Sequence, residues 1–297
     1  MFTRYWCITI FVIGFFGHSL NLFIFTRRTL RYNPCVRYLM ASAIGGYLII
    51  FILIPIRTLQ FGYGLSLFLS SEITCKIMTF VCSWIRMLPC WFLALASVDR
   101  FFCSSTSSTL RRLSSLRVSL WLIPSVTIFI GITQIPILIF FKINPQPRIC
   151  LGQPNLFQKV NGILIMIMWS LIPSLATLIF GFLTVRHIRQ SAQRAAGHKS
   201  GNRRKVRIKT VDRQLIQITL TQSILFGVTS ATGAIGGMFN IIDNRSRKDP
   251  LTLAKQSLIG NILSFIGLLS PCISFYICTL SSQLFRRELK NIFYTQQ

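Results

Sequence analysis

The sequence has 297 residues, of which 52% are hydrophobic, and its formal net charge at pH 7 is +26. The apolar residues fall in long blocks, whereas a water-soluble domain of this length spreads them over amphipathic stripes and contains both signs of charge. With only 6 acidic residues against 32 Lys and Arg, the composition excludes an ordinary soluble domain and indicates an integral membrane protein.

Seven apolar blocks follow one another along the chain, and each is long enough to cross a membrane as a helix. About 20 apolar residues span the hydrocarbon layer, and a helix satisfies its backbone hydrogen bonds internally there. The blocks are too long for the strands of a barrel. We therefore predict an all-α membrane protein, a seven-transmembrane helix bundle that forms a single domain over residues 1–297. The predicted spans are 5–26, 38–56, 77–98, 118–141, 162–185, 215–242 and 251–280, with a short amphipathic helix at about 281–293.

Lys and Arg are divided unevenly between the two sides of this bundle. The side that contains the third inner loop has about twice as many as the other, including ten between Arg186 and Arg213. The richer side is expected to be cytoplasmic. This predicts a multi-pass protein of the plasma membrane with its amino terminus outside and its carboxyl terminus in the cytoplasm. Two interpretations of the basic third inner loop stay open, an anchor on anionic membrane lipids and a contact with an acidic partner; nucleic acid is not expected.

Motifs of enzymes and of metal-binding proteins do not occur in the sequence. It has no phosphate-binding glycine loop, no Cys and His at metal-site spacing and no Ser/His/Asp set, and its 3 His are scattered. We therefore predict no enzyme activity, no catalytic residue, no metal and no cofactor.

Most of the nine cysteines lie within predicted helices, where a thiol behaves as a small apolar group. Cys75 and Cys150 differ, because one begins the third helix at the outer face and the other lies in the second outer loop. Disulfides persist on the oxidising, extracellular side. The sequence therefore predicts a disulfide between Cys75 and Cys150 that holds this loop at the mouth of the bundle.

Arg100 follows Cys75 by 25 residues. At 1.5 Å per residue this is about 37 Å of helix, enough to cross the bilayer. Arg100 is therefore expected at the inner face, next to Asp99. Spacing alone leaves two interpretations open: the Asp-Arg pair ends the helix, where an arginine suits the helix dipole, or it is a functional pair.

The outer cysteine, the triplet Asp99-Arg100-Phe101 and the loop cysteine together resemble the rhodopsin-like (class A) family of G-protein-coupled receptors. Further similarities extend over almost the whole chain. Trp121 and Pro173 match residues of the fourth and fifth helices, and residues 210–217 resemble the start of the sixth. Residues 285–289 resemble the short helix after the seventh, and 17–35 resemble invertebrate neuropeptide receptors of the FMRFamide-receptor type.

The resemblance implies a receptor that converts the binding of an extracellular ligand, a peptide by the subfamily resemblance, into activation of a heterotrimeric G protein. It also implies a two-state bundle in which Arg100 is held by Asp99 and by Asp212 at the foot of the sixth helix. Breaking this ionic lock would free Arg100 to face the G protein. The alternative is that Asp212 only offsets Lys209 and Arg213.

The chain departs from the family pattern at three places. Gly46 stands near the position of the second-helix acid of the family's sodium site. The sixth helix has Ser230 and Thr232 in place of its Trp and Pro, and the Asn-Pro-x-x-Tyr motif is broken around Pro271. These departures put the sodium site in doubt and leave open a receptor-like protein that binds ligand without signalling.

Arg86 is the residue that stands out for ligand binding. It lies 14 residues before Arg100, within about 40° of the same helix face and ~21 Å closer to the outside. A charge at membrane depth costs at least ~2.5–3.5 kcal/mol and usually marks function. No acidic residue lies in any predicted span to neutralise it. Either Arg86 binds backbone carbonyls or water, or it receives an anionic or carbonyl group of the ligand. Cys82 takes the place of the aspartate of amine receptors, so we do not expect an amine ligand.

The predicted outer loops are basic and contain a glycosylation sequon at Asn244. Their positive field favours acidic ligands. A transporter or channel is the main rival from another class. It would predict paired intramembrane charges, broken helices in matching halves or inverted repeats, and the sequence shows none of these.

Overall fold

The computed structural model describes residues 2–196 apart from 28–29, 106, 146–147 and 154, residues 214–231 apart from 215 and 223, and short runs or single residues between 255 and 286. Five helices in this part of the chain are long and apolar enough to cross a membrane. Asp212, Asn244, Pro271 and most of the predicted amphipathic helix lie outside the described residues.

Helices occur at each of the first five predicted spans. The first is α1 (Phe2–Phe25). The second comprises α2 (Pro34–Leu48), η1 (Ile49–Leu53), α3 (Ile54–Arg57) and η2 (Thr58–Gly62). The third and fourth are α4 (Glu72–Ser104) and α6 (Leu116–Phe140), and the fifth comprises α7 (Asn155–Met166), η4 (Ile167–Leu171) and α8 (Ile172–Ala196). The short helices η3 (Leu67–Leu69) and α5 (Ser108–Leu113) lie in connecting loops.

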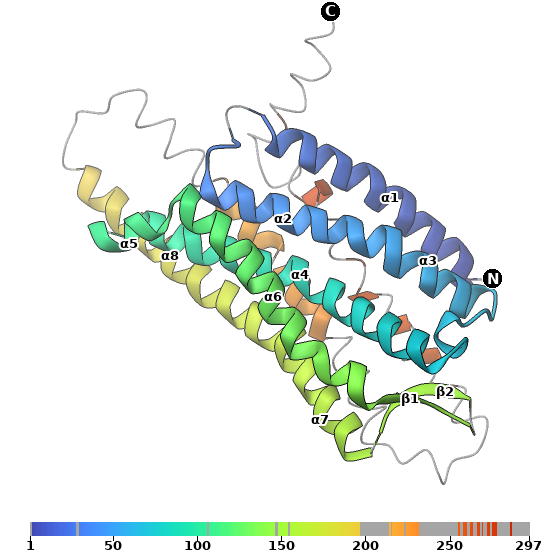
Figure 1. The fold of residues 1–297 in the computed structure, drawn as a ribbon. Helices are drawn as coiled ribbons and strands as arrows, with labels where there is room; N and C mark the ends of the chain where they lie inside the picture. The colour runs from blue at the N-terminus through green and yellow to red at the C-terminus, as the bar shows by residue number, and fades with distance from the viewer. Residues whose placement is uncertain are drawn as a thin grey trace, which may run out of the picture.

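The central element is α4, which packs against α2, α6 and α8. The long helices run alongside one another, with α1 packed on α2 (Figure 1). Three clusters of buried apolar side chains fill the bundle, and α4 contributes to each of them. We call the end that contains Cys75 and Cys150 the disulfide end, and the opposite end the Arg100 end.

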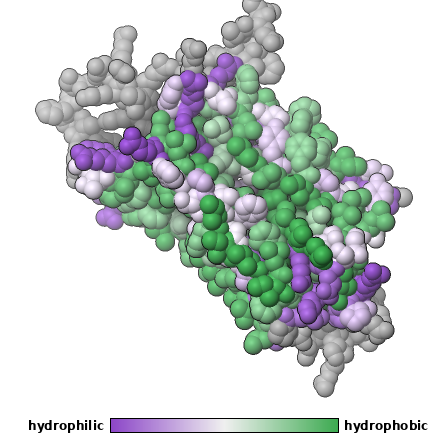
Figure 2. Space-filling model, in the orientation of Figure 1, coloured by the Kyte–Doolittle hydropathy of each residue, from purple (hydrophilic) through white to green (hydrophobic). Residues whose placement is uncertain are grey.

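The surface of the bundle is apolar over its middle. Side chains such as Phe16, Ile128 and Phe182 are more than half exposed, at 57%, 61% and 68%. In Figure 2 apolar residues cover the centre of the face in view, and hydrophilic residues gather toward the two ends. An exposed apolar patch of this extent is unfavourable in water and is solvated by lipid chains in a bilayer. The surface is that of a multi-pass membrane protein.

Helix α4 is longer than the predicted span 77–98 at both ends. It begins at Glu72 because the hydroxyl of Ser71 caps it, accepting a hydrogen bond from the backbone N–H of Thr74 at 3.1 Å. It ends at Ser104. Pro89 lies inside it and is tolerated, since membrane helices re-satisfy a freed carbonyl through their neighbours. Cys75 and Arg100 are therefore parts of one continuous helix.

Two π-helical segments precede prolines in the second and fifth spans. η1 comes just before Pro55 and η4 just before Pro173. Proline has no N–H to donate to the preceding turn, and its ring crowds the carbonyl there. A wider π turn accommodates the residue without ending the helix. The second span therefore continues past Pro55 to Gly62, beyond the predicted end at residue 56.

A small antiparallel sheet corrects the all-α prediction. Strands β1 (Phe141–Asn144) and β2 (Ile149–Gly152) pair with Ile143 opposite Cys150. The two strands contain aromatic and β-branched residues, which favour extended backbone, and the turn between them contains Pro145. The segment was predicted only as a loop, because strands this short give little sequence signal.

The glycine pair Gly45-Gly46 lies where α2 packs closely against its neighbours. The neighbouring helices approach α2 closely at these two positions. A Cβ added at Gly45 would lie 3.1 Å from Cγ of Pro89 on α4, and one added at Gly46 would overlap the imidazole ring of His18 on α1. Ser42, one turn earlier, donates a hydrogen bond to the carbonyl of Pro89 at 3.1 Å. Small residues let membrane helices pack at short range.

We predict that Gly46→Ala destabilises the protein, because its methyl group needs space that His18 fills. Overpacking of this kind costs about 1–3 kcal/mol. Thermal unfolding of detergent-purified protein should show a midpoint several degrees lower. Gly131→Ala is the matched control, since its Cβ would be in ordinary contact with Trp84 at 3.4 Å. Equal midpoints for the Gly46→Ala protein and the wild type would contradict this account of the packing.

Candidate functional site

Asp99 and Arg100 form a buried ion pair near the end of α4. Their side chains are 4% and 3% exposed, and Nη2 of Arg100 donates to Oδ2 of Asp99 at 2.7 Å. The helix continues for another turn to Ser104. The pair therefore lies one turn before the end of the helix.

Asn33 is the second partner of Arg100. Its Oδ1 accepts a hydrogen bond from Nη2 of Arg100 at 2.8 Å. The same oxygen accepts from the backbone N–H of Cys35 at 3.1 Å, so Asn33 caps α2, with Pro34 in the first turn. One side chain therefore begins α2 and also holds the guanidinium of α4.

Ser114 is the partner of Asp99 from the loop between α5 and α6. Its hydroxyl donates to Oδ1 of Asp99 at 2.8 Å, while Oδ2 accepts from Arg100. The two oxygens of Asp99 thus join α4 to a loop that follows it by 15 residues. We call Asn33, Asp99, Arg100 and Ser114 the polar latch.

The energetic role of the polar latch follows from its burial. Removing an ion pair from water costs several kcal/mol per ion, which the attraction between the two charges repays only with good geometry and further hydrogen bonds. The best-attested use of such a pair is to specify one arrangement over another. Two of the hydrogen bonds in the latch connect α4 to other segments, one to Asn33 at the start of α2 and one to Ser114 in the loop before α6. Asp212, the predicted acidic partner from the sixth span, lies outside the described residues.

The disulfide end is closed by covalent and polar contacts. Cys75 and Cys150 form a disulfide with their Cα atoms 5.8 Å apart, a usual separation for this bond. It fastens β2 to the first turn of α4. Arg148, just before β2, also donates to the carbonyl of Leu69 at 3.3 Å. The hairpin is therefore held over the disulfide end.

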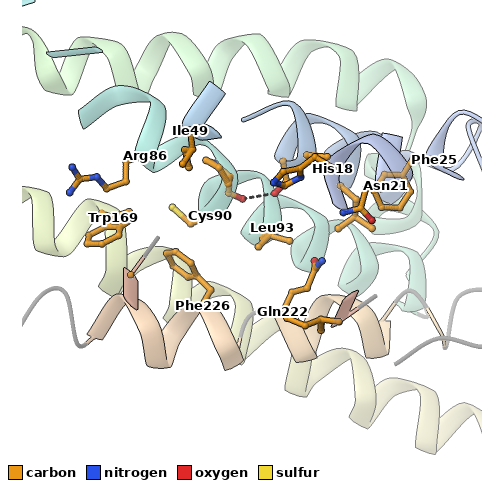
Figure 3. A pocket seen from close by; sticks show the side chains of 16 residues that line it. His18, Asn21, Phe25, Ile49, Arg86, Cys90, Leu93, Trp169, Gln222 and Phe226 are labelled. Carbon is orange, nitrogen blue, oxygen red and sulfur yellow. Dashed lines mark hydrogen bonds between the residues drawn. The ribbon is translucent and has the colours of Figure 1, made fainter. Parts of the chain in front are cut away.

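A narrow cavity lies in the middle of the bundle (Figure 3). Its lining includes Arg86, His18 and Trp169, from α4, α1 and η4 respectively. The free volume is about 30 Å³, the space of one or two water molecules. Arg86 faces this interior, as its helical phase relative to Arg100 predicted. Cys82 is buried, at 4% exposure, one turn closer to the disulfide end, and is not part of the lining.

Trp169 is the main aromatic residue of this cavity. Its ring lies 5.3 Å from the guanidinium carbon of Arg86, within cation–π range. The next residue, Ser170, has its hydroxyl 2.9 Å from that of Ser230 in the predicted sixth span. The resemblance places a Trp in the sixth helix where this chain has Ser230, and Ser230 is hydrogen-bonded to Ser170 of the fifth span. The tryptophan next to this contact is Trp169, which belongs to the fifth span.

His18 occupies the space next to Gly46. It is 2% exposed, and its ring lies 5.6 Å from that of Tyr47. Gly46 contributes no carboxylate, and an acidic side chain there would overlap the imidazole. The geometry agrees with the expectation from sequence that the second-helix acid of a sodium site is missing.

Arg57 is a further arginine in a helical segment that is long and apolar enough to cross a membrane, five residues before the end of that segment at Gly62. The predicted second span ended at residue 56, but the helical segment extends to Gly62, so Arg57 lies within an apolar span. Its side chain is half-buried, and its guanidinium carbon lies 5.3 Å from the ring of Phe61. The error came from reading Pro55 as the end of a helix, when the π segment before it lets the helix continue.

Sequence reasoning missed five residues of these sites: Asn33, Ser114, Arg57, Trp169 and His18. The first had a usable signal, because Asn followed by Pro is the pattern of a capped helix start. Its contact with Arg100, 67 residues away, could not be read from the chain. The positions of Trp169 and His18 depend on how the helices rotate against one another.

The comparison with known families agrees with this geometry. The family model described as 7 transmembrane receptor (rhodopsin family) matches residues 20–277. The chain belongs to the rhodopsin family of seven-transmembrane receptors. A comparison with curated proteins finds no match. The family match covers most of the five described spans and reaches the described parts of the sixth and seventh predicted spans.

Membership in this family defines the general activity. The chain is a G-protein-coupled receptor, which binds an extracellular ligand and acts through a heterotrimeric G protein, and it is not an enzyme. The described residues agree with this, since the receptor has membrane-spanning helices and the disulfide between Cys75 and Cys150.

We predict that Asn33→Ala raises ligand-independent signalling. The substitution removes one acceptor of Arg100, and a hydrogen bond to a charged group contributes about 1.5–3 kcal/mol. Basal G-protein activation should rise roughly 10-fold or more, measured in transfected cells at matched surface expression.

Two further variants separate this effect from the loss of the helix cap. Asn33→Ser keeps a capping hydroxyl that is too short to reach Arg100, and should also raise basal activity. Asn33→Asp keeps both the cap and the acceptor, and should not. If only Asn33→Ala changed the signal, the cap would explain the result and Asn33 would have no part in holding Arg100.

Proposed function

We propose that the receptor binds a peptide or another ligand with an anionic group at the disulfide end, and activates its G protein at the Arg100 end. The disulfide end would face the outside, with the amino terminus, and the Arg100 end and carboxyl terminus would face the cytoplasm of a plasma-membrane protein. The concentration of Lys and Arg on the Arg100 side supports this orientation.

The observation that supports the proposal most directly is the course of α4. This one helix begins beside the disulfide, passes Arg86 in the cavity and reaches the polar latch. A shift or rotation of one rigid helix moves both of its ends. Membrane helices packed in a bundle move as rigid bodies. A ligand whose affinity for Arg86 differs between two positions of α4 would therefore change the fraction of receptors in which the hydrogen bonds of the polar latch are broken.

Arg86 is the proposed contact for the ligand. Its Nε is buried and has no hydrogen-bond partner among the described residues, and its guanidinium rests on Trp169. The guanidinium can donate several hydrogen bonds in a fixed planar arrangement. A ligand group that accepts them would satisfy the buried donor. The resemblance of residues 17–35 to neuropeptide receptors supports a peptide ligand.

The first test is a functional screen. Cells that express the receptor are exposed to amidated and acidic peptides while G-protein activation and ion flux are recorded. Ligand-evoked activation supports the proposal. Ligand binding without activation would identify a receptor-like protein that does not signal, and ion flux without G-protein activation would favour a transporter.

We predict that Arg86→Ala lowers the potency of the agonist found in this screen. Loss of a charge-assisted hydrogen bond of about 1.5–3 kcal/mol corresponds to a roughly 10- to 100-fold higher half-maximal concentration. Lys142→Ala, an exposed charge on β1 at the same end, is the control and should change potency little. Full potency in the Arg86→Ala receptor would remove this residue from the binding site.

We also predict that Asp212→Ala raises basal signalling, because the proposed ionic lock on Arg100 would lose its acidic partner. Asp212→Glu keeps the charge and should behave like the wild type. Unchanged basal signalling of Asp212→Ala at equal surface expression would assign the restraint of Arg100 to Asp99 and Asn33 alone.

A further inference from the structure

The loop between α4 and α6 contains two arginines directly ahead of Ser114. Arg111 and Arg112 lie three and two residues before this serine, in the last turn of α5, and both side chains are exposed. In Figure 1 α5 lies at one end of the bundle, which is the Arg100 end. Basic residues at a fixed distance before a serine form the kind of charge pattern by which protein kinases select their substrates. A kinase groove lined with carboxylates would bind the two guanidinium groups.

The backbone at Ser114 is not helical. This residue follows the last residue of α5 with φ −82° and ψ 74°, and Ser115, just before α6, is extended with φ −133° and ψ 154°. The hydroxyl of Ser115 caps α6, accepting a hydrogen bond from the backbone N–H of Val118 at 3.3 Å. Surface loops between rigid helices are the segments of a folded chain that an enzyme reaches most readily. Ser114 therefore lies in a segment that a kinase can bind, whereas Ser115 is engaged as a helix cap.

The hydroxyl of Ser114 has a partner that a phosphate could not keep. It donates to Oδ1 of Asp99 at 2.8 Å, and this carboxylate is 4% exposed. A phosphorylated serine carries a charge of about −1.5 to −2 at pH 7, and beside a carboxylate it is repelled. Its oxygens, once ionised, are acceptors without a hydrogen to donate. The contact between this loop and α4 is therefore possible with a serine and is broken by a phosphate.

We propose that Ser114 is a phosphorylation site for a serine kinase that recognises basic residues, and that the phosphate opens the polar latch. In the transfer, the serine oxygen bonds to the γ-phosphorus of ATP while the bond from that phosphorus to the β–γ bridging oxygen breaks. ADP leaves, and the hydroxyl proton passes to the aspartate base of the kinase. This inference rests on the proposed function, which places the Arg100 end in the cytoplasm, where ATP-dependent kinases act.

The two arginines have a role before and after the transfer. Before it, Arg111 and Arg112 hold the acidic groove of the kinase. After it, they are exposed cations close in sequence to the phosphate, which binds guanidinium groups through charge-assisted hydrogen bonds. The modified serine therefore exchanges an acidic partner inside the bundle for basic partners at its surface. This exchange favours the open arrangement of the loop.

The contact with Asp99 also makes phosphorylation depend on the state of the latch. While Ser114 donates to this carboxylate, its oxygen lies against α4 and cannot enter the active site of a kinase. Only receptors in which the hydrogen bond is broken are substrates. Because the phosphate in turn prevents the bond from forming again, each effect reinforces the other, as linkage requires.

The site is tested on folded, detergent-purified, full-length receptor. The probe is cyclic-AMP-dependent protein kinase, which selects serines that follow arginines, with magnesium and ATP, and the modified residues are mapped by mass spectrometry. We expect phosphate on Ser114. The double variant Arg111→Gln, Arg112→Gln should be modified there roughly 10-fold or more slowly. Ser108→Ala is the control, since this exposed serine has no arginine in the five residues before it. Phosphate found only on other residues, or a rate that the double variant does not change, would overturn the proposal.

Asp99→Asn tests whether the buried contact protects the hydroxyl. The amide oxygen is a weaker acceptor than the carboxylate, so the rate of phosphorylation at Ser114 should rise roughly 5-fold. Glu72→Gln removes a carboxylate from the opposite end of α4 and should leave the rate unchanged. All rates are compared below the unfolding midpoint of each variant. The same rate in Asp99→Asn and in the wild type would contradict the dependence on the latch.

The effect of the phosphate on the loop is measured by hydrogen–deuterium exchange over residues 108–115. Exchange should become roughly 10-fold faster after phosphorylation and return to its first rate after treatment with a phosphatase. Unchanged exchange would overturn the opening of the latch. Basal G-protein activation is recorded separately. Faster exchange without a rise in basal activation would keep this inference, and would count against the latch as the restraint on the G protein in the proposed function.

Discussion

The structure depends on α4 being one uninterrupted helix whose Arg86, Asp99 and Arg100 side chains face the inside of an apolar bundle. From the cap at Ser71 to Ser104 its backbone hydrogen bonds are internal, which a membrane requires of any segment that crosses it. This rod fixes how far the disulfide lies from Arg100, and it places Arg86 between them. Helices α2, α6 and α8 pack against it. At one end it is bonded to strand β2, and at the other to Asn33 and Ser114.

The arginines in the two halves of the bundle differ in the partners that the chain gives them. At the Arg100 end the guanidinium has a carboxylate at 2.7 Å and an amide oxygen at 2.8 Å, so its charge and its donors are both satisfied by the chain. In the disulfide-end half, Arg57 and Arg86 have aromatic faces and no carboxylate among the described residues. A cluster whose charges and donors are satisfied stabilises one arrangement, whereas a cation without a carboxylate partner is costly in an apolar bundle. The first property suits a switch that must stay closed, and the second suits a binding site.

The departures from the family pattern also have physical counterparts in the packing. Where a second-helix acid was expected, Gly46 makes room for His18 of α1. Where a sixth-helix Trp was expected, Ser230 bonds to Ser170, and the adjacent Trp169 turns its ring to Arg86. The centre of the bundle is therefore filled by His18 from the first span and Trp169 from the fifth. The family pattern places an acid from the second helix and a Trp from the sixth there. A close-packed interior requires such exchanges to be coupled, since a side chain lost from one helix leaves space that another must fill.

The sequence by itself determined the class of the protein, the apolar blocks that became the five described spans, the pairing of Cys75 with Cys150 and the inward face of Arg86. These features follow from hydropathy, from residue type and from helical phase within one segment, which are local properties of the chain. Only the tertiary structure decided that Asn33 holds Arg100, that Trp169 lies against Arg86 and that His18 packs next to Gly46. Each of these depends on the rotation and offset of one helix against another, which are set by the packing of side chains distant in sequence. The continuation of the second helix past Pro55 depends on a π turn, whose signal is too weak to read from a single sequence.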